Sequence, residues 1–128
     1  MTLTTLILLV LALYLLQIFL QETSRFGFDL RGIVGSRDHP PALSVVAARL
    51  ERAKDNLRES LPFFLALALL ALVRGGDASR SEHAATVFLV ARVAYVPAYV
   101  SGLPWLRSIT WLVSIASLGA MALAVARP

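Results

Sequence analysis

Three polar residues have the spacing to share one face of a helix just before a long apolar run. Arg52, Asn56 and Glu59 precede residues 60–73, a stretch without charge. At about 100° per residue, these three side chains fall within about 60° of one another on a helix. A guanidinium, an amide and a carboxylate on one face can bind a small zwitterion, because each charged end of the ligand meets a complementary group.

A second polar face occurs later in the chain, where Arg92, Tyr95 and Tyr99 also fall within about 60° of one another. A charged side chain at membrane depth costs at least about 2.5–3.5 kcal/mol, so such residues usually face protein or an aqueous cavity. We therefore expect Arg52, Glu59 and Arg92 to face protein. The alternative is a polar network that only fixes how the helices pack.

The composition places these residues in a membrane protein. The chain has 128 residues, of which 58% are hydrophobic and 16% charged, with a mean hydropathy of +0.74. This is too much apolar surface for one small soluble core. With no cysteine and only two histidines, thiolate sites are excluded and no metal site is expected. The net charge of +4 comes from basic residues interleaved with acids, which argues against nucleic-acid binding.

The hydropathy pattern predicts an all-α fold, an integral membrane four-helix bundle that runs up, down, up and down. The first 21 residues carry no charge, and about 20 residues at about 1.5 Å each cross a hydrocarbon core of about 30 Å. We expect an uncleaved anchor here rather than a signal peptide, because no cation precedes the run and no small-residue cleavage site ends it. The whole chain is interpreted as one domain, with helices at about 2–22, 43–73, 83–103 and 106–126.

The predicted helices are separated by polar segments. We expect residues 22–44 to form a loop outside the hydrocarbon, and residues 74–82 to form a turn with a helix cap at Ser79 or Ser81. Pro62 should bend the second helix or be accommodated by neighbouring helices. Most of the lysines and arginines flank one side of the predicted spans, which predicts that this side is cytoplasmic and both termini extracytoplasmic.

Three motifs resemble the MAPEG family, the membrane-associated proteins in eicosanoid and glutathione metabolism. The first motif runs from Arg52 to Phe63, the second is Ala91-Arg92-Val-Ala-Tyr95-Val-Pro-Ala-Tyr99, and the third is Arg107-Ser108-Ile-Thr-Trp111. The resemblance covers roughly residues 35–119, and residues 35–44 are most similar to a bacterial branch. The chain departs from the pattern at Ser60 and Trp111, where certain family members have tyrosines.

The resemblance implies a function for the polar faces. It implies glutathione as co-substrate, Arg107 as the residue that favours the thiolate, and the following glutathione contacts: Arg52, Asn56, Glu59, Tyr95, Tyr99, Lys54 and Arg31. It also implies a homotrimer that is embedded in a lipid bilayer, and we expect this bilayer to be the bacterial inner membrane. The implied activity is that of a transferase or peroxidase acting on lipophilic electrophiles or lipid hydroperoxides.

Two other interpretations come from different classes of protein. One is a small membrane binding or scaffold protein that has the same fold without turnover. The other is a small drug-proton antiporter, which would need a carboxylate within its first span. Residues 1–21 contain no acid, which argues against the antiporter.

Overall fold

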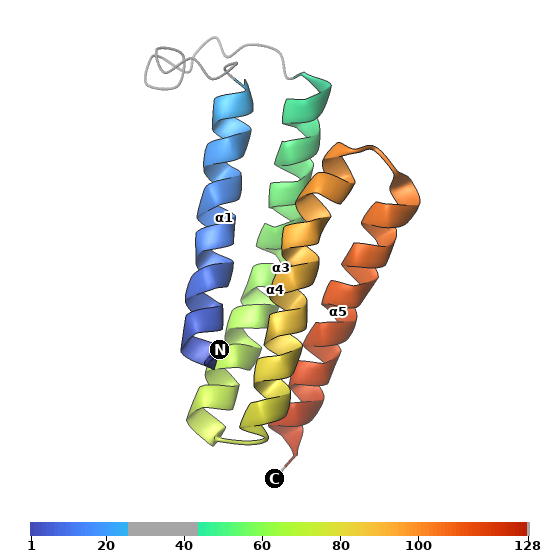
Figure 1. Cartoon of the computed structure of the whole chain (residues 1–128). Coiled ribbons are helices and arrows are strands. Elements are labelled where there is room, and N and C mark those ends of the chain that lie inside the picture. Colours follow the sequence, from blue (N-terminus) through green and yellow to red (C-terminus); the bar gives the residue numbers. More distant parts are fainter. Residues whose placement is uncertain (26–43, 128) are drawn as a thin grey trace.

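The computed structural model describes residues 1–25 and 44–127, and these residues form a bundle of four helices (Figure 1). Successive helices run in opposite directions, so both termini lie at the same end. Each helix is long and apolar enough to cross a membrane. The predicted all-α bundle is therefore confirmed, with the helices α1 (Leu3–Arg25), α3 (Val45–Arg74), α4 (Ala78–Val100) and α5 (Pro104–Ala126).

Specific residues determine where the helices begin and end. The Ser44 hydroxyl accepts a hydrogen bond from the Ala47 amide (3.1 Å) and caps α3. The Asp77 carboxylate accepts one from the Arg80 amide (3.0 Å) and caps α4. The prediction of a cap at Ser79 or Ser81 was wrong, because Asp77 provides the cap and α4 therefore begins at Ala78 instead of residue 83.

The turns and prolines also differ from the predicted boundaries. Helix α1 continues to Arg25, three residues past its predicted end at 22, while the rest of the predicted loop lies outside the described residues. Helix α4 ends at Val100 instead of 103, because Gly102 adopts a φ of 78° that only glycine tolerates easily. Helix α3 is continuous through Pro62 and α4 through Pro97.

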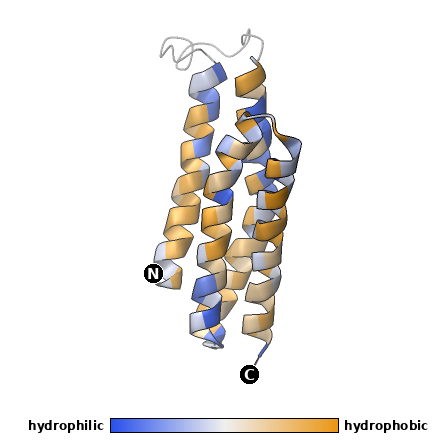
Figure 2. Cartoon of the chain, turned by 45° about the vertical axis from the view of Figure 1, so that its right-hand side comes forward, coloured by the Kyte–Doolittle hydropathy of each residue, from blue (hydrophilic) through white to orange (hydrophobic). Residues whose placement is uncertain are grey.

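Apolar side chains fill the half of the bundle nearest the two termini. The rings of Phe64 and Phe88 stack with centroids 4.7 Å apart, and both are completely buried. Leu6 and Met121 belong to the same buried cluster. Figure 2 shows that hydrophobic residues dominate the middle of the helices, with polar residues mostly toward their ends. Exposed side chains such as Phe19 (69%) suit a surface surrounded by hydrocarbon.

The orientation of the bundle leads to a first prediction. We expect Pro128 and Gly76 to lie outside the cytoplasm and Ser36 inside, because most lysines and arginines flank the Ser36 side. A reporter enzyme that is active only outside the cytoplasm should therefore work when fused at Pro128 or Gly76. The same reporter should be inactive at Ser36, and activity there alone would reverse the orientation.

Candidate functional site

One cavity collects polar residues from three helices near the end where α4 turns into α5. Its volume is about 300 Å³. Helix α3 contributes residues from its first half, α4 from its last turns and α5 from its first turns, because the three antiparallel helices meet at this end. Among the lining residues are Arg52, Asn56, Tyr95, Tyr99, Arg107, Ser108 and Trp111. Two residues from each predicted polar face and the predicted thiolate-stabilising arginine thus meet in one place.

Tyr99 lies close to two guanidinium groups in this cavity. The Nε atom of Arg52 donates a hydrogen bond to the Tyr99 hydroxyl oxygen (3.1 Å). The Cζ atom of Arg107 lies 5.1 Å from the centroid of the Tyr99 ring, and the Cζ atom of Arg52 lies 5.7 Å from it. Both distances are within the range of cation–π attraction. No acid among the described residues lines the cavity, so the two positive charges favour an anionic ligand.

A smaller cavity of about 220 Å³ adjoins the first one and adds a third arginine. Arg49 Nη1 donates a hydrogen bond to the Val100 carbonyl oxygen (2.9 Å), which holds its guanidinium at the end of α4. A Cβ atom on Gly102 would lie 2.9 Å from two nitrogens of that guanidinium. Arg49 was not predicted as a site residue, although its position three residues before Arg52 places it on the same helical face.

Asn56 connects the main cavity to a pocket that contains Glu59. This pocket has a volume of about 170 Å³, and its other walls come mainly from apolar residues. The Asn56 Oδ1 atom is buried and has no hydrogen-bond partner among the described residues. Buried polar atoms are nearly always hydrogen-bonded, so this oxygen is suited to accept a hydrogen bond from a ligand. Glu59 itself is exposed at the surface of the single chain.

Arg92 lies one turn deeper and is almost fully buried, with 1% of its surface exposed. Its Cζ atom lies 4.3 Å from the centroid of the Tyr95 ring, and its Nη1 atom donates a long hydrogen bond of 3.5 Å to the Ser114 hydroxyl. Its Nε and Nη2 atoms have no partner within the described part of the chain. Arg92 therefore faces protein as predicted. Its guanidinium packs against the Tyr95 ring, but Arg92 does not line the main cavity.

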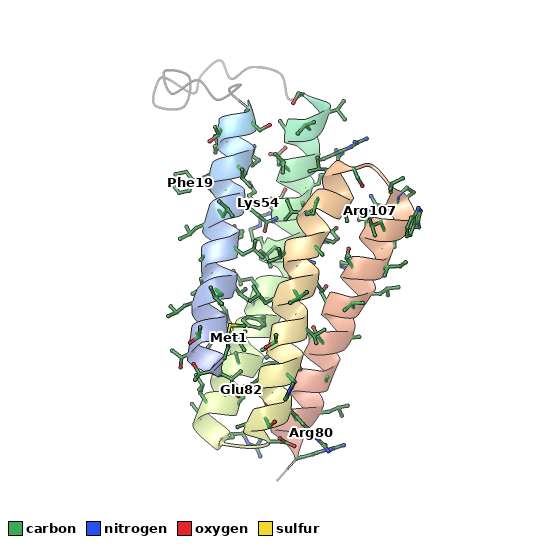
Figure 3. All side chains as sticks on the ribbon, in the orientation of Figure 1. Met1, Phe19, Lys54, Arg80, Glu82 and Arg107 are labelled. Carbon is green, nitrogen blue, oxygen red and sulfur yellow. The ribbon has the colours of Figure 1, made fainter. Side chains whose placement is uncertain are left out.

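The remaining predicted contacts are not found in this cavity. The Lys54 Nζ atom donates a hydrogen bond to Gln21 Oε1 of α1 (3.3 Å) and lies 3.8 Å from Asp55 Oδ1. Figure 3 shows Lys54 between α1 and α3, whereas Arg107 is at the start of α5. Arg31 lies outside the described residues. The prediction that Lys54 and Arg31 contact glutathione remains a prediction.

Comparison with known proteins places the chain in a family. A comparison with the curated proteins gives no match. The model of the MAPEG family, however, matches residues 1–127, nearly the whole chain, and the four helices that it covers can each span a bilayer. This integral membrane protein therefore belongs to the MAPEG family.

Proposed function

We propose that this protein is a glutathione-dependent membrane enzyme that acts on lipophilic electrophiles or lipid hydroperoxides. The observation that carries the proposal is that Arg52 and Arg107 both lie next to one tyrosine, in a cavity that also contains an Asn56 oxygen with no hydrogen-bond partner among the described residues. This set of groups suits a peptide that carries two carboxylates, an ammonium group and a thiol. Membership of a family associated with glutathione metabolism supports the same ligand.

Each group of the cavity has a role in holding the tripeptide. The guanidinium of Arg52 would pair with a carboxylate, and a charged hydrogen bond of this kind contributes about 1.5–3 kcal/mol. Glu59 would pair with the ammonium group, while Asn56 would accept a hydrogen bond from the peptide backbone. The hydroxyls of Tyr95 and Tyr99 would fix the orientation of the ligand. These residues would then leave Arg107 to interact with the thiol.

The chemistry depends on forming a thiolate at Arg107. The thiol releases its proton to water, and the guanidinium stabilises the negative sulfur. In conjugation, the sulfur forms a bond to an electrophilic carbon, and the leaving group departs with its electron pair. With a hydroperoxide, the sulfur attacks the terminal peroxide oxygen and the O–O bond breaks, which gives a sulfenic acid and an alkoxide. The alkoxide then takes a proton from water and becomes an alcohol. A second glutathione then converts the sulfenic acid into a disulfide and water.

We also propose that the active unit is a homotrimer, with both termini extracytoplasmic in the bacterial inner membrane. Arg52 and Glu59 are exposed in the single chain, and a charged side chain at membrane depth is costly when it faces lipid. A neighbouring subunit would cover these residues and close the cavity. Lys54 and Arg31 would contact the ligand from such a neighbour.

The proposal is tested by assaying purified protein in detergent with glutathione and an activated aryl chloride, or with an organic hydroperoxide. We expect product formation above the spontaneous rate, proportional to protein concentration. The alternative is a non-catalytic scaffold of the same fold. Glutathione binding without turnover of either substrate would favour that alternative, and the absence of both binding and turnover would refute glutathione as the ligand.

A further inference from the structure

A groove runs along α4 and α5 on a face that the proposed glutathione site does not use. It consists of two cavities, of about 400 Å³ and about 270 Å³, and Val87 lines both of them. On α5 the groove is bordered by residues such as Ile109 and Leu123, whereas the glutathione cavity is bordered by Arg107 and Trp111. At about 100° per residue, these two sets lie on opposite sides of α5.

The end of the groove nearest the chain termini is lined by basic side chains. Arg80 and His83 of α4 and Arg127 after α5 line the larger cavity, and neither cavity has an acid among its described lining residues. Arg80 uses its Nε atom for an ion pair with Asp77 (3.1 Å), but its side chain remains 61% exposed. Figure 3 shows Arg80 beside the C-terminal end of α5. Two guanidinium groups thus line the head of the groove.

Close backbone packing holds the two sides of this head together. A Cβ atom on Gly76 would lie 3.0 Å from the Ala124 carbonyl oxygen and 3.6 Å from that of Arg127. The turn before α4 therefore packs directly on the end of α5. The His83 Nδ1 atom donates a hydrogen bond to the Ser79 carbonyl oxygen (2.7 Å), which fixes the imidazole ring against α4.

Beyond the basic end, the walls of the groove are almost entirely apolar, because the hydroxyls of its two threonines, Thr86 and Thr110, donate hydrogen bonds to carbonyl oxygens of their own helices. Ala84, Val87, Val90 and Ala94 line it on α4. From His83 to Ala94 the helix rises by about 17 Å at about 1.5 Å per residue. This is close to half of a hydrocarbon core of about 30 Å, the depth of one leaflet. The groove therefore has the length of a lipid chain whose head lies at the membrane surface.

We propose that this groove binds one anionic phospholipid, with its phosphate between Arg80 and Arg127 and an acyl chain along Val87 and Val90. The basic residues at one end of the groove indicate an anionic lipid headgroup, and the apolar walls beyond them indicate an acyl chain. Arginine side chains pair readily with phosphate groups, and the phosphate of an anionic phospholipid lies at the membrane surface. This proposal does not depend on the proposed enzymatic function, because the two sites share no lining residue.

The proposal is tested by measuring lipid binding to the purified full chain by native mass spectrometry, with phosphatidylglycerol and phosphatidylcholine as probes. Phosphatidylglycerol should bind more tightly. The double variant Arg80→Ala/Arg127→Ala should bind it about 30-fold more weakly, which corresponds to about 1 kcal/mol for each arginine. Arg74→Ala is the matched control, because Arg74 is an exposed cation at the same end that lines neither cavity. It should bind phosphatidylglycerol like the wild type.

A second pair of variants tests the tail. Val87→Phe should fill the junction of the two cavities and weaken binding of phosphatidylglycerol, whereas Val93→Phe should not, because Val93 is exposed on α4 outside the groove. The proposal is overturned if both lipids bind equally, or if Arg74→Ala and the double variant behave alike. Displacement by inorganic phosphate would identify a soluble anion instead. Loss of the oligomer in Val87→Phe would identify a second copy of the chain as the occupant.

Discussion

The Arg107→Ala variant is expected to lose about 10²–10³-fold in turnover while its affinity for glutathione falls much less. Removing one preorganised group that stabilises negative charge in an active site has an effect of this size. Arg107 is the only cation between Arg92 and Arg127 in the sequence, and its guanidinium lies 5.1 Å from the Tyr99 ring centroid within the cavity. No other residue of α5 can replace its charge near the sulfur.

The pH dependence distinguishes this role from simple packing. A free thiol has a pKa of about 8.5, so it is mostly protonated at neutral pH unless a positive charge favours the thiolate. Loss of Arg107 should raise the pKa of the bound thiol toward 8.5, and higher pH should then partly restore the rate. The thiolate can be followed by its ultraviolet absorbance during titration with glutathione. Equal thiolate signals and equal pH–rate profiles in both proteins would exclude Arg107 as the activating residue.

Arg58→Ala is the matched control for this experiment. Arg58 is a cation of α3 whose side chain is 63% exposed and lies 3.8 Å from Asp55 Oδ1, outside the main cavity. Its removal changes the net charge by the same amount as Arg107→Ala. We expect normal turnover in this control, because an exposed pair of this kind contributes little to structure.

The second large effect is expected for Arg52→Ala and Glu59→Gln, each of which should weaken glutathione binding by about 10- to 150-fold. This range corresponds to the loss of one charged hydrogen bond, about 1.5–3 kcal/mol. Titration calorimetry on the purified variants would measure the affinity, and size-exclusion chromatography would show whether the oligomer remains intact. We expect the oligomer to be unchanged, because these side chains are proposed to hold the ligand.

The control for the carboxylate is Glu51→Gln, which removes the same charge from a residue of α3 that lines neither the main cavity nor the Glu59 pocket. This control should bind glutathione as the wild type does. If Arg52→Ala and Glu59→Gln bind normally but dissociate in detergent, the two residues form a packing network instead of a ligand site.

The sequence was sufficient to predict the helices because apolar runs in a membrane leave the backbone few alternatives. Their ends were harder to predict. Good capping residues occur at three positions, Asp77, Ser79 and Ser81. The backbone that leaves Gly75 and Gly76 determines which of them caps α4, and in the structure it is Asp77. Similar limits applied at Arg25, where α1 continues into residues that were expected to form a loop.

The composition of the site could be predicted only as far as helical geometry extends. The spacing of Arg52 and Asn56 placed them on one face, but it could not show which other helix that face meets. The contact between Arg52 and Tyr99 depends on the alignment of α3 with α4, which is set by packing far away, such as the stacked rings of Phe64 and Phe88. The same alignment places Lys54 against Gln21, which the spacing along α3 did not reveal.

Helix α3 is longer than its partners, which bears on where the proposed glutathione cavity would lie relative to the membrane surface. Its 30 residues span about 45 Å, against about 35 Å for the 23 residues of α4. The hydrogen bond from Arg49 to the Val100 carbonyl oxygen sets the end of α4 beside the second turn of α3. The first turn of α3 therefore extends beyond the end of α4, as Figure 1 shows. With a hydrocarbon core of about 30 Å, the thiol would enter from water and the lipophilic substrate from the bilayer. The second substrate would then show surface dilution kinetics, because its effective concentration is its mole fraction among the lipids. Adding inert phospholipid would therefore slow the enzyme even when the bulk concentration of the second substrate is kept constant.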